Sequence, residues 1–141
     1  DDVKRMEMSG LITSEQAQIV DVERIYRFFQ TPLGYKIRTS REVLREFKFS
    51  ILENADIYYT NVRNDAILLQ GVIDCALIED EGITVLDFKT DFITETNITE
   101  KIDQYREQVR TYAKALSRIY QKQVYASYIY FFSSEQLVRI D

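Results

Sequence analysis

The sequence predicts an α/β (α+β) fold in which a central mixed β-sheet is flanked by helices. Two observations support this prediction. Residues 67–78 and 83–89 are runs rich in branched residues, separated by a short acidic turn. A long helical pattern follows at about residues 99–121, and strand-like runs come after it at 124–132 and 136–140. A length of 141 residues, of which 45% are hydrophobic, suits one domain with its own core.

Two helices are expected between residues 13 and 39. Thr13-Ser14-Glu15-Gln16 resembles a capping box, and the apolar spacing after it predicts a helix to about Phe29. Thr31-Pro32-Leu33-Gly34 contains the only proline of the chain and ends this helix, because proline removes a backbone donor. A short second helix is expected near Gly34–Thr39.

A first strand is expected over residues 43–52, where aromatic and polar side chains alternate. Every second residue of a strand lies on the same face. One face carries Phe47, Phe49 and Ile51, and the other carries Glu46, Lys48 and Ser50.

The next two strands form a hairpin that brings two aspartates together. The polar residues 79–82 end in glycine and form the turn. If Ile78 pairs with Ile83 across this turn, the antiparallel register places Asp74 opposite Asp87. Directly opposed side chains have Cβ atoms roughly 4.5–5.5 Å apart.

The same alternation assigns the side chains of the second hairpin strand to faces. Asp87 and Lys89 share the face of Asp74, whereas Leu86 and Phe88 point away from it into a core. Opposed like charges destabilise a strand pair, and a divalent cation would offset the repulsion. Carboxylate oxygens suit hard cations such as Mg²⁺ or Mn²⁺. The alternative is a solvated sheet edge where both aspartates pair with basic side chains.

These segments resemble a known nuclease family. Asp74 followed by Asp87-x-Lys89 is similar to the core motif of the PD-(D/E)XK nuclease superfamily, and the surrounding segments resemble its RecB-like members, in particular the carboxy-terminal nuclease domains of AddA-type (RexA) helicase–nuclease subunits. The segments that carry this resemblance are FFQTPLG at 28–34, QGVID at 70–74, VLDFKTD at 85–91, QVRTYAKAL at 108–116 and YFFSSEQLV at 130–138.

The resemblance implies a restriction-endonuclease-like core and a Mg²⁺-dependent deoxyribonuclease, with Mn²⁺ as a substitute metal. Asp74 and Asp87 would hold the metal together with the backbone carbonyl of Phe88, and Lys89 would act on the attacking water and the developing charge. The implied reaction is exonucleolytic cleavage of a DNA strand fed by a helicase, during the processing of double-strand breaks for recombinational repair. The implied partner is the second subunit of an AddAB/RexAB-type complex in the bacterial cytoplasm.

Three further residues take their expected roles from the resemblance. Glu46 follows Arg45 as in the AddA-like domains, where this glutamate lies near the metal; the alternative is a surface glutamate paired with a neighbouring basic residue. Gln108 and Tyr112 share one helix face because they are four residues apart. In the resembling motif they contact the DNA backbone or metal-bound water, although Tyr112 also suits ordinary helix packing.

The charge pattern does not by itself indicate a DNA-binding protein. A net charge of −5 makes the chain a poor free-standing DNA binder, so we expect a larger machine to deliver the DNA. Basic residues recur every four positions along the long helix, which suits either a stripe that follows phosphates or a solvated helix face. They are Arg106, Arg110, Lys114, Arg118 and Lys122.

Some function classes are excluded by what the sequence lacks. There is no GxxxxGK[ST] phosphate loop, so we expect no ATP site in this chain, although the parent subunit that the resemblance implies would be an ATP-dependent helicase. The single cysteine, Cys75, excludes a four-cysteine iron–sulfur cluster and suits a buried thiol that points away from Asp74. No apolar run is long enough to cross a membrane.

The chain contains no histidine, whereas the RecB-like family supplies a histidine metal ligand from a helix upstream of these motifs. We therefore expect residues 1–141 to be a single PD-(D/E)XK nuclease domain within a larger protein, with a metal site one ligand short and weak or no activity alone. Two alternatives remain: a catalytically inactive nuclease fold that docks or guides DNA, and a site-specific endonuclease of the restriction type.

Overall fold

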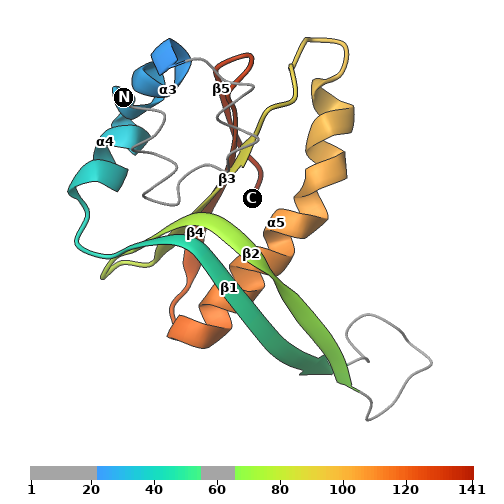
Figure 1. Cartoon of the computed structure of the whole chain (residues 1–141). Helices are drawn as coiled ribbons and strands as arrows, with labels where there is room; N and C mark the ends of the chain where they lie inside the picture. The colour runs from blue at the N-terminus through green and yellow to red at the C-terminus, as the bar shows by residue number, and fades with distance from the viewer. Residues whose placement is uncertain (1–21, 55–65) are drawn as a thin grey trace.

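The structure is a computed structural model that describes residues 22–54 and 66–141. A five-stranded mixed β-sheet forms its centre. The strands lie in the order β1-β2-β3-β4-β5, so neighbours in the sequence are also neighbours in the sheet (Figure 1). Their bounds are β1 (Val43–Asn54), β2 (Ala66–Ile78), β3 (Ile83–Lys89), β4 (Val124–Phe131) and β5 (Gln136–Arg139). The β3–β4 pair is parallel and the others are antiparallel, which confirms the predicted mixed sheet.

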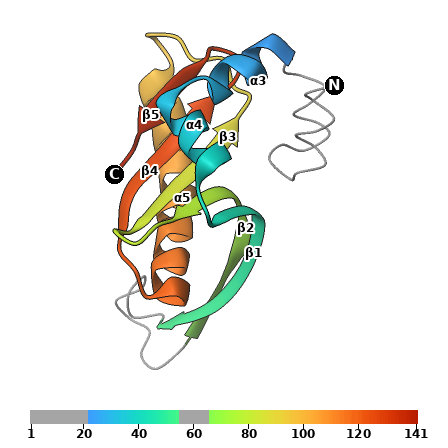
Figure 2. The ribbon, with the colours of Figure 1, turned by 90° about the vertical axis from the view of Figure 1, so that its left-hand side faces the viewer.

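Helices lie on both faces of the sheet. The long helix α5 (Ile98–Tyr120) connects the parallel strands β3 and β4 along one face. The short helices α3 (Val22–Phe29) and α4 (Pro32–Thr39) lie on the other face (Figure 2). None of the helices in the described part of the chain is long and apolar enough to cross a membrane.

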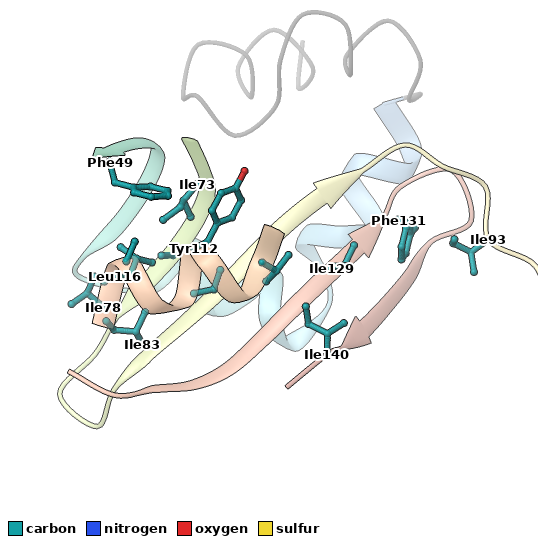
Figure 3. Close-up of a cluster of buried hydrophobic side chains, with 14 residues drawn as sticks. Phe49, Ile73, Ile78, Ile83, Ile93, Tyr112, Leu116, Ile129, Phe131 and Ile140 are labelled. Atoms are coloured by element: carbon teal, nitrogen blue, oxygen red, sulfur yellow. The ribbon is translucent and has the colours of Figure 1, made fainter. Parts of the chain in front are cut away.

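Each helical layer forms its own core with the sheet. We call the larger one the α5 core; its buried residues are Phe49, Ile73, Ala76, Ile78, Ile83, Val85, Ile93, Val109, Tyr112, Ala115, Leu116, Ile129, Phe131 and Ile140 (Figure 3). We call the other the α3–α4 core; its buried residues are Ile25, Phe28, Ile37, Cys75, Leu77, Leu86, Phe88, Tyr130 and Phe132.

The link between α3 and α4 shows a second role of Pro32. The sequence predicts that this proline ends the first helix, and α3 does end at Phe29. Pro32 is also the first residue of α4, two residues before its predicted start. The side chain of Thr31 caps α4 by accepting a hydrogen bond from the backbone N–H of Gly34, 3.1 Å away. Proline at the first helical position removes no helical hydrogen bond, because the N–H of that residue has no partner within the helix. The predicted start at Thr13 lies outside the described residues.

The β2–β3 hairpin has the register that the sequence predicts. Ile78 pairs with Ile83 and Cys75 pairs with Leu86. The turn at residues 79–82 is closed by two backbone hydrogen bonds between its first and last residues, of 3.0 and 3.2 Å. The other strands and the long helix begin and end within two residues of their predicted limits.

The β1–β2 ribbon bends where Glu46 lies opposite Asp74, between the pairs Arg45–Cys75 and Phe47–Ile73. In both strands, residues three apart pack against the α5 core: Leu44 and Phe47 in β1, and Ile73 and Ala76 in β2. Regular alternation would place such residues on opposite faces. Glu46 also has a positive φ of 47°. The faces predicted for residues 47–51 are confirmed, because Phe47, Phe49 and Ile51 pack against the α5 core while Lys48 and Ser50 are exposed. The same alternation does not run back through Glu46 to Leu44, because the strand bends at Glu46.

Beyond this bend the two strands continue as an arm, residues 47–54 and 66–73, which pairs with no third strand among the described residues (Figure 1). One face of the arm packs on α5 through side chains such as Phe49. At the end of β1, Glu53 is 9% exposed and forms ion pairs with Arg118 and Lys114 of α5, at 3.1 and 3.7 Å. These contacts fix the arm against the helix.

Candidate active site

Asp74 and Asp87 lie at the point where β2 leaves β3. The backbone pairing of these strands extends to Cys75 and Leu86, and the two aspartates are the next residues of their strands. The carboxylate of Asp74 accepts a hydrogen bond from the backbone N–H of Phe88 at 2.9 Å. The Asp74 side chain therefore takes the place of a backbone carbonyl acceptor where the hydrogen-bonded pairing of β2 and β3 ends. This bond holds the Asp74 carboxylate beside β3.

Asp87 is the more buried of the two aspartates, with 3% of its surface exposed. The ammonium group of Lys89 lies 3.1 Å from its Oδ2 atom. This pair has ion-pair distance but lacks the directional geometry of a hydrogen bond, so the buried Oδ2 has no hydrogen-bond donor in the described structure. A buried carboxylate oxygen without a donor is a costly arrangement unless another group binds it.

The two carboxylates influence each other strongly. Burial, and then the negative charge of Asp87, raise the pKa of Asp74 to about 8 from its ordinary value of 3.8. The hydrogen bond from Phe88 and the charge of Lys89 oppose this rise. The pair therefore retains a proton near neutral pH and carries one negative charge rather than two. A divalent cation at this position would replace the proton and relieve the repulsion.

Lys89 connects the aspartates to helix α5. Its Nζ atom donates a hydrogen bond to Oε1 of Gln108 at 3.0 Å, and Nε2 of Gln108 donates one to the hydroxyl of Tyr112 at 2.9 Å. The structure thus joins Asp87, Lys89, Gln108 and Tyr112 in one continuous set of contacts. The spacing of Gln108 and Tyr112 is what permits the last of them, because residues four apart are neighbours on a helix surface.

Tyr112 both packs the helix and contributes a polar group to the site, the two roles that the sequence left open. Its ring is buried in the α5 core, with the ring centroid 5.8 Å from that of Phe49 (Figure 3). Its hydroxyl bonds Gln108 at the edge of the site. Gly71 makes room for this arrangement, since a Cβ atom there would lie 3.0 Å from Cε1 of Tyr112. One residue therefore packs the helix and extends the polar site.

Glu46 stands apart from this set of contacts. Glu46 lies opposite Asp74 in the pairing of β1 with β2, and the residue is exposed to solvent. Within residues 22–54 and 66–141, no hydrogen bond or ion pair joins its carboxylate to either aspartate. Its expected role near the metal stays a prediction.

The basic residues spaced four apart, of which Lys122 lies just beyond the end of α5, are engaged by acidic or carbonyl groups. This favours the solvated helix face over a stripe that follows phosphates. The pairs are Arg106–Asp103 at 3.6 Å, Arg110–Glu107 at 2.9 Å, Lys114–Glu53 at 3.7 Å, Arg118–Glu53 at 3.1 Å and Lys122 with the backbone oxygen of Glu79 at 2.9 Å.

The buried thiol expected at Cys75 is confirmed. Cys75 lies in the α3–α4 core, on the face of the sheet away from α5. Burial raises the pKa of this thiol to about 12, so it stays protonated and unreactive.

Sequence reasoning missed three residues that surround Lys89. The ring of Tyr105 lies under the ammonium group, with 4.3 Å from Nζ to the ring centroid. The hydroxyl of Tyr105 bonds the carboxylate of Asp91, which forms an ion pair with Lys101. Two signals could have found them: Asp91 continues the alternation of Asp87 and Lys89, and Tyr105 lies one helical turn before Gln108.

The residues present fit a hard divalent cation that keeps part of its water shell. No group of three or more His, Cys, Asp or Glu side chains converges on a metal position within the described ranges. Mg²⁺ is commonly bound through one or two carboxylates with waters completing its octahedron. The donor-free oxygen of Asp87 and the shared proton of the pair are the features that such an ion would satisfy.

Comparison with known proteins agrees with the resemblance seen in the motifs. The sequence matches the PD-(D/E)XK nuclease superfamily over residues 8–139. It is 33% identical over 147 residues to an ATP-dependent helicase/nuclease subunit of Oceanobacillus iheyensis. It is 37% identical over 150 residues to the protein of the same name from Bacillus cytotoxicus, and 37% identical over 134 residues to that from a Thermoanaerobacter species.

These alignments cover 92–99% of this chain and 11–12% of each relative, so the chain spans a small part of the length of the curated relatives it matches. The fold is also similar to the crystal structure of SSO0001, with a TM-score of 0.53 over 99% of this chain and 62% of that one. Sequence identity to SSO0001 is 12%, so this likeness concerns the fold alone.

Proposed function

This chain belongs to the PD-(D/E)XK nuclease superfamily, and from that membership we propose that it hydrolyses phosphodiester bonds of DNA with a bound divalent metal, Mg²⁺ or Mn²⁺. The observation that carries the proposal is the buried aspartate pair, Asp74 and Asp87, beside the ammonium group of Lys89. Carboxylates for the metal and a cation for the developing phosphate charge are the groups that metal-assisted phosphodiester hydrolysis requires.

The relatives suggest the setting of this activity. Each of the three relatives described above is named as one subunit of an ATP-dependent helicase/nuclease and is several times longer than this chain. We infer that residues 1–141 are the nuclease domain of such a protein. The substrate would be a DNA strand delivered by the helicase and cleaved exonucleolytically during break repair. The partner would be the second subunit of the complex, in the bacterial cytoplasm where the chromosome lies.

The aspartate pair would hold the metal. Asp74 and Asp87 supply carboxylate oxygens, and the backbone carbonyl of Phe88 supplies a third ligand. The hydrogen bond from the Phe88 N–H orients the Asp74 carboxylate before any metal arrives. When bound, the metal would lower the pKa of a water molecule and polarise the scissile phosphate. Glu46, which lies opposite Asp74 at the bend, would be close to the bound metal.

Lys89 and the two α5 residues would act on the DNA. Lys89 has 19% of its side chain exposed, so its ammonium group can reach a phosphate oxygen while it remains partly shielded from water. There it would position the attacking water and stabilise the charge that develops on the phosphate, in a setting where a fixed cation is more effective than in bulk water. Gln108 and Tyr112 would orient the strand through their amide and hydroxyl groups.

The test measures cleavage of end-labelled single-stranded and duplex DNA in Mg²⁺. It compares wild type with Asp87→Ala and Lys89→Ala, both in this chain and in the full-length protein that contains it. Loss of one such electrostatic group costs about 10²- to 10³-fold in kcat, so both variants should lose nearly all cleavage. Circular dichroism would establish that they remain folded. Asp103→Ala, an exposed carboxylate of α5, is the matched control and should cleave normally. Full activity in Asp87→Ala or Lys89→Ala would overturn the proposal.

A further inference from the structure

Tyr105 lies between the proposed active site and an ion pair that the proposed chemistry does not use. The face of its ring lies 4.3 Å from Nζ of Lys89, within the range of a cation–π contact. Its hydroxyl donates to the carboxylate of Asp91, at 2.9 Å from Oδ1 and 3.0 Å from Oδ2. The same carboxylate lies 3.0 Å from Nζ of Lys101.

The ammonium group of Lys89 is held from three directions. Oδ2 of Asp87 lies at 3.1 Å, Oε1 of Gln108 at 3.0 Å and the ring of Tyr105 below it. A lysine side chain has a flexible four-carbon stem, and fixing it costs conformational entropy that must be offset by contacts. Of the three contacts, Gln108 is an exposed amide and Asp87 is a proposed metal ligand. The tyrosine ring is the one contact that needs no rearrangement when metal and substrate bind.

The ring is itself fixed at its far end. Burial alone would raise the pKa of Asp91, but hydrogen bonds from Lys101 and Tyr105 lower it, so this carboxylate stays an ionised acceptor for the tyrosine hydroxyl. Asp91 follows β3, whereas Lys101 and Tyr105 are one turn apart on α5. The contacts therefore connect the end of the strand that carries Lys89 to the helix that carries Gln108.

We propose that Tyr105 is a positioning residue for Lys89, and that Asp91 and Lys101 hold Tyr105 in the orientation that this requires. The role rests on the proposed nuclease function, since it assigns to Lys89 the part described above. Tyr105 touches the lysine but neither metal nor substrate. It acts by keeping the ammonium group at one place, so its loss lowers turnover more than substrate affinity.

The kinetic test, made in the full-length protein that contains this chain, compares Tyr105→Leu, which removes the ring, with Tyr105→Phe, which keeps the ring and removes the hydroxyl. We expect Tyr105→Leu to lower kcat about 10- to 100-fold, the range for residues that orient a functional group, with KM changed by less than about 3-fold. Tyr105→Phe and Asp91→Asn keep the ring but release its far end, so each should lower kcat less than Tyr105→Leu does and by about the same factor as the other. In a Lys89→Ala background Tyr105→Leu should add nothing, because both changes act through the same group.

Two matched controls separate this role from general effects of removing a tyrosine. Tyr35→Leu removes a ring that contacts another cation, the guanidinium of Arg38 at 5.6 Å, on the opposite layer of the fold. Tyr125→Phe removes another hydroxyl-to-carboxylate hydrogen bond, to Glu79 at 2.8 Å. Both should leave kcat unchanged. An unchanged kcat in Tyr105→Leu, or a loss carried entirely by KM, would overturn the proposal.

A second readout does not depend on activity. In NMR spectra of the chain with ¹³C-labelled lysine, protons next to Nζ of Lys89 should be shifted upfield by the tyrosine ring, with Lys89→Ala providing the assignment. The shift should persist in Tyr105→Phe and disappear in Tyr105→Leu. An unshifted Lys89 signal in wild type would overturn the positioning role. A full-length wild-type protein that cleaves no DNA would overturn the proposed function, while the NMR signal of the chain would still decide whether Tyr105 contacts Lys89.

Discussion

The carboxylate of Asp74 accepts a hydrogen bond from the backbone N–H of Phe88, 2.9 Å away, in the place where the β2–β3 ladder would have a backbone acceptor. The bond keeps Asp74 from rotating away from Asp87, although the two negative charges repel each other. It also lets β2 separate from β3 without leaving the N–H of Phe88 unsatisfied. The separation of the strands and the closeness of the carboxylates therefore have one cause.

The first prediction concerns pH. The folded-state pKa of Asp74 is raised to about 8, whereas the unfolded chain titrates near the ordinary 3.8. The folded state binds this proton more tightly, so the free energy of unfolding of the metal-free chain should fall as pH rises from about 4 to about 8. Asp74→Asn keeps an oxygen for the Phe88 N–H and removes the titration. It should therefore gain stability over wild type through this range, by on the order of a few kcal/mol at about 1.4 kcal/mol per pKa unit.

The measurement is urea unfolding of wild type and Asp74→Asn at several pH values between 5 and 9, with a chelator present. Asp141→Asn is the control, because the hydrogen bond from Arg139 lowers the pKa of Asp141. The stability that Asp141 contributes is lost only as pH falls through its lowered pKa, so the difference between this variant and wild type should be flat above pH 5. A flat difference for Asp74→Asn as well would show that neither burial nor the charge of Asp87 raises the pKa of Asp74.

The second prediction concerns the metal. Mn²⁺ or Mg²⁺ should bind wild type and raise its stability, by about 2.7 kcal/mol at a free ion concentration 100 times Kd. The Asp74→Ala/Asp87→Ala variant should lose both effects, since it lacks both carboxylates. Because the metal displaces the shared proton, affinity should increase with pH up to about 8, the pKa of Asp74.

Isothermal titration calorimetry with Mn²⁺, together with thermal unfolding in Mg²⁺, provides the data. Glu107→Ala/Asp103→Ala, which removes two exposed carboxylates of α5, is the control for unspecific binding and should behave as wild type. Equal binding by wild type and the double aspartate variant would contradict a metal site at this pair. It would favour instead a nuclease fold that only docks or guides DNA.

The sequence was sufficient to predict the hairpin and its register, because a turn of fixed length and period-two alternation determine which residues face each other. The same alternation holds for residues 47–51 of β1, but it does not continue through Glu46 to Leu44. The hydrophobic pattern does not reveal a bend at which both strands change faces together, because Leu44 and Phe47 are apolar and suit a straight strand or a bent one. The sequence alone therefore could not show that β1 bends at Glu46.

The surroundings of Lys89 show a different limit. Gln108 and Tyr112 could be found because they lie four apart on one helix. Tyr105 and Asp91 are joined by a hydrogen bond between a helix and the end of a strand, 14 residues apart in sequence. Nothing in local periodicity predicts such a contact, and it depends on how α5 packs against the sheet. Long-range side-chain contacts of this kind have to be read from the fold.

The third prediction tests the packing beneath the site. In Gly71→Ala the new Cβ would lie 3.0 Å from Cε1 of Tyr112 and 3.1 Å from Cε1 of Phe49. Those two rings pack against each other, so neither can move away freely. We expect a loss of about 1–3 kcal/mol in the free energy of unfolding, the usual cost of overpacking, although alanine is ordinarily the better strand residue.

Urea unfolding of Gly71→Ala beside Gln70→Ala measures this effect. Gln70 is exposed and neighbours Gly71 in the same strand, so its replacement should change stability by less than about 0.5 kcal/mol. Because the hydroxyl of Tyr112 bonds Gln108, Gly71→Ala should also reduce DNA cleavage. Wild-type stability in Gly71→Ala would mean that the rings adjust without cost.

The last prediction concerns the arm. Glu53 is nearly buried and forms ion pairs with Arg118 and Lys114, whereas Glu107 pairs with Arg110 at a similar distance, 2.9 Å, in full exposure to solvent. Exposed pairs contribute about 0–1 kcal/mol, whereas the shielded carboxylate of Glu53 accepts a hydrogen bond from the charged guanidinium of Arg118, a kind of bond worth about 1.5–3 kcal/mol. Glu53→Ala should therefore cost about 1–3 kcal/mol in the free energy of unfolding, and Glu107→Ala less than about 0.5 kcal/mol. Hydrogen exchange should show faster opening of residues 47–54 in Glu53→Ala alone. Equal effects of the two substitutions would mean that apolar packing, and not this ion pair, holds the arm on α5.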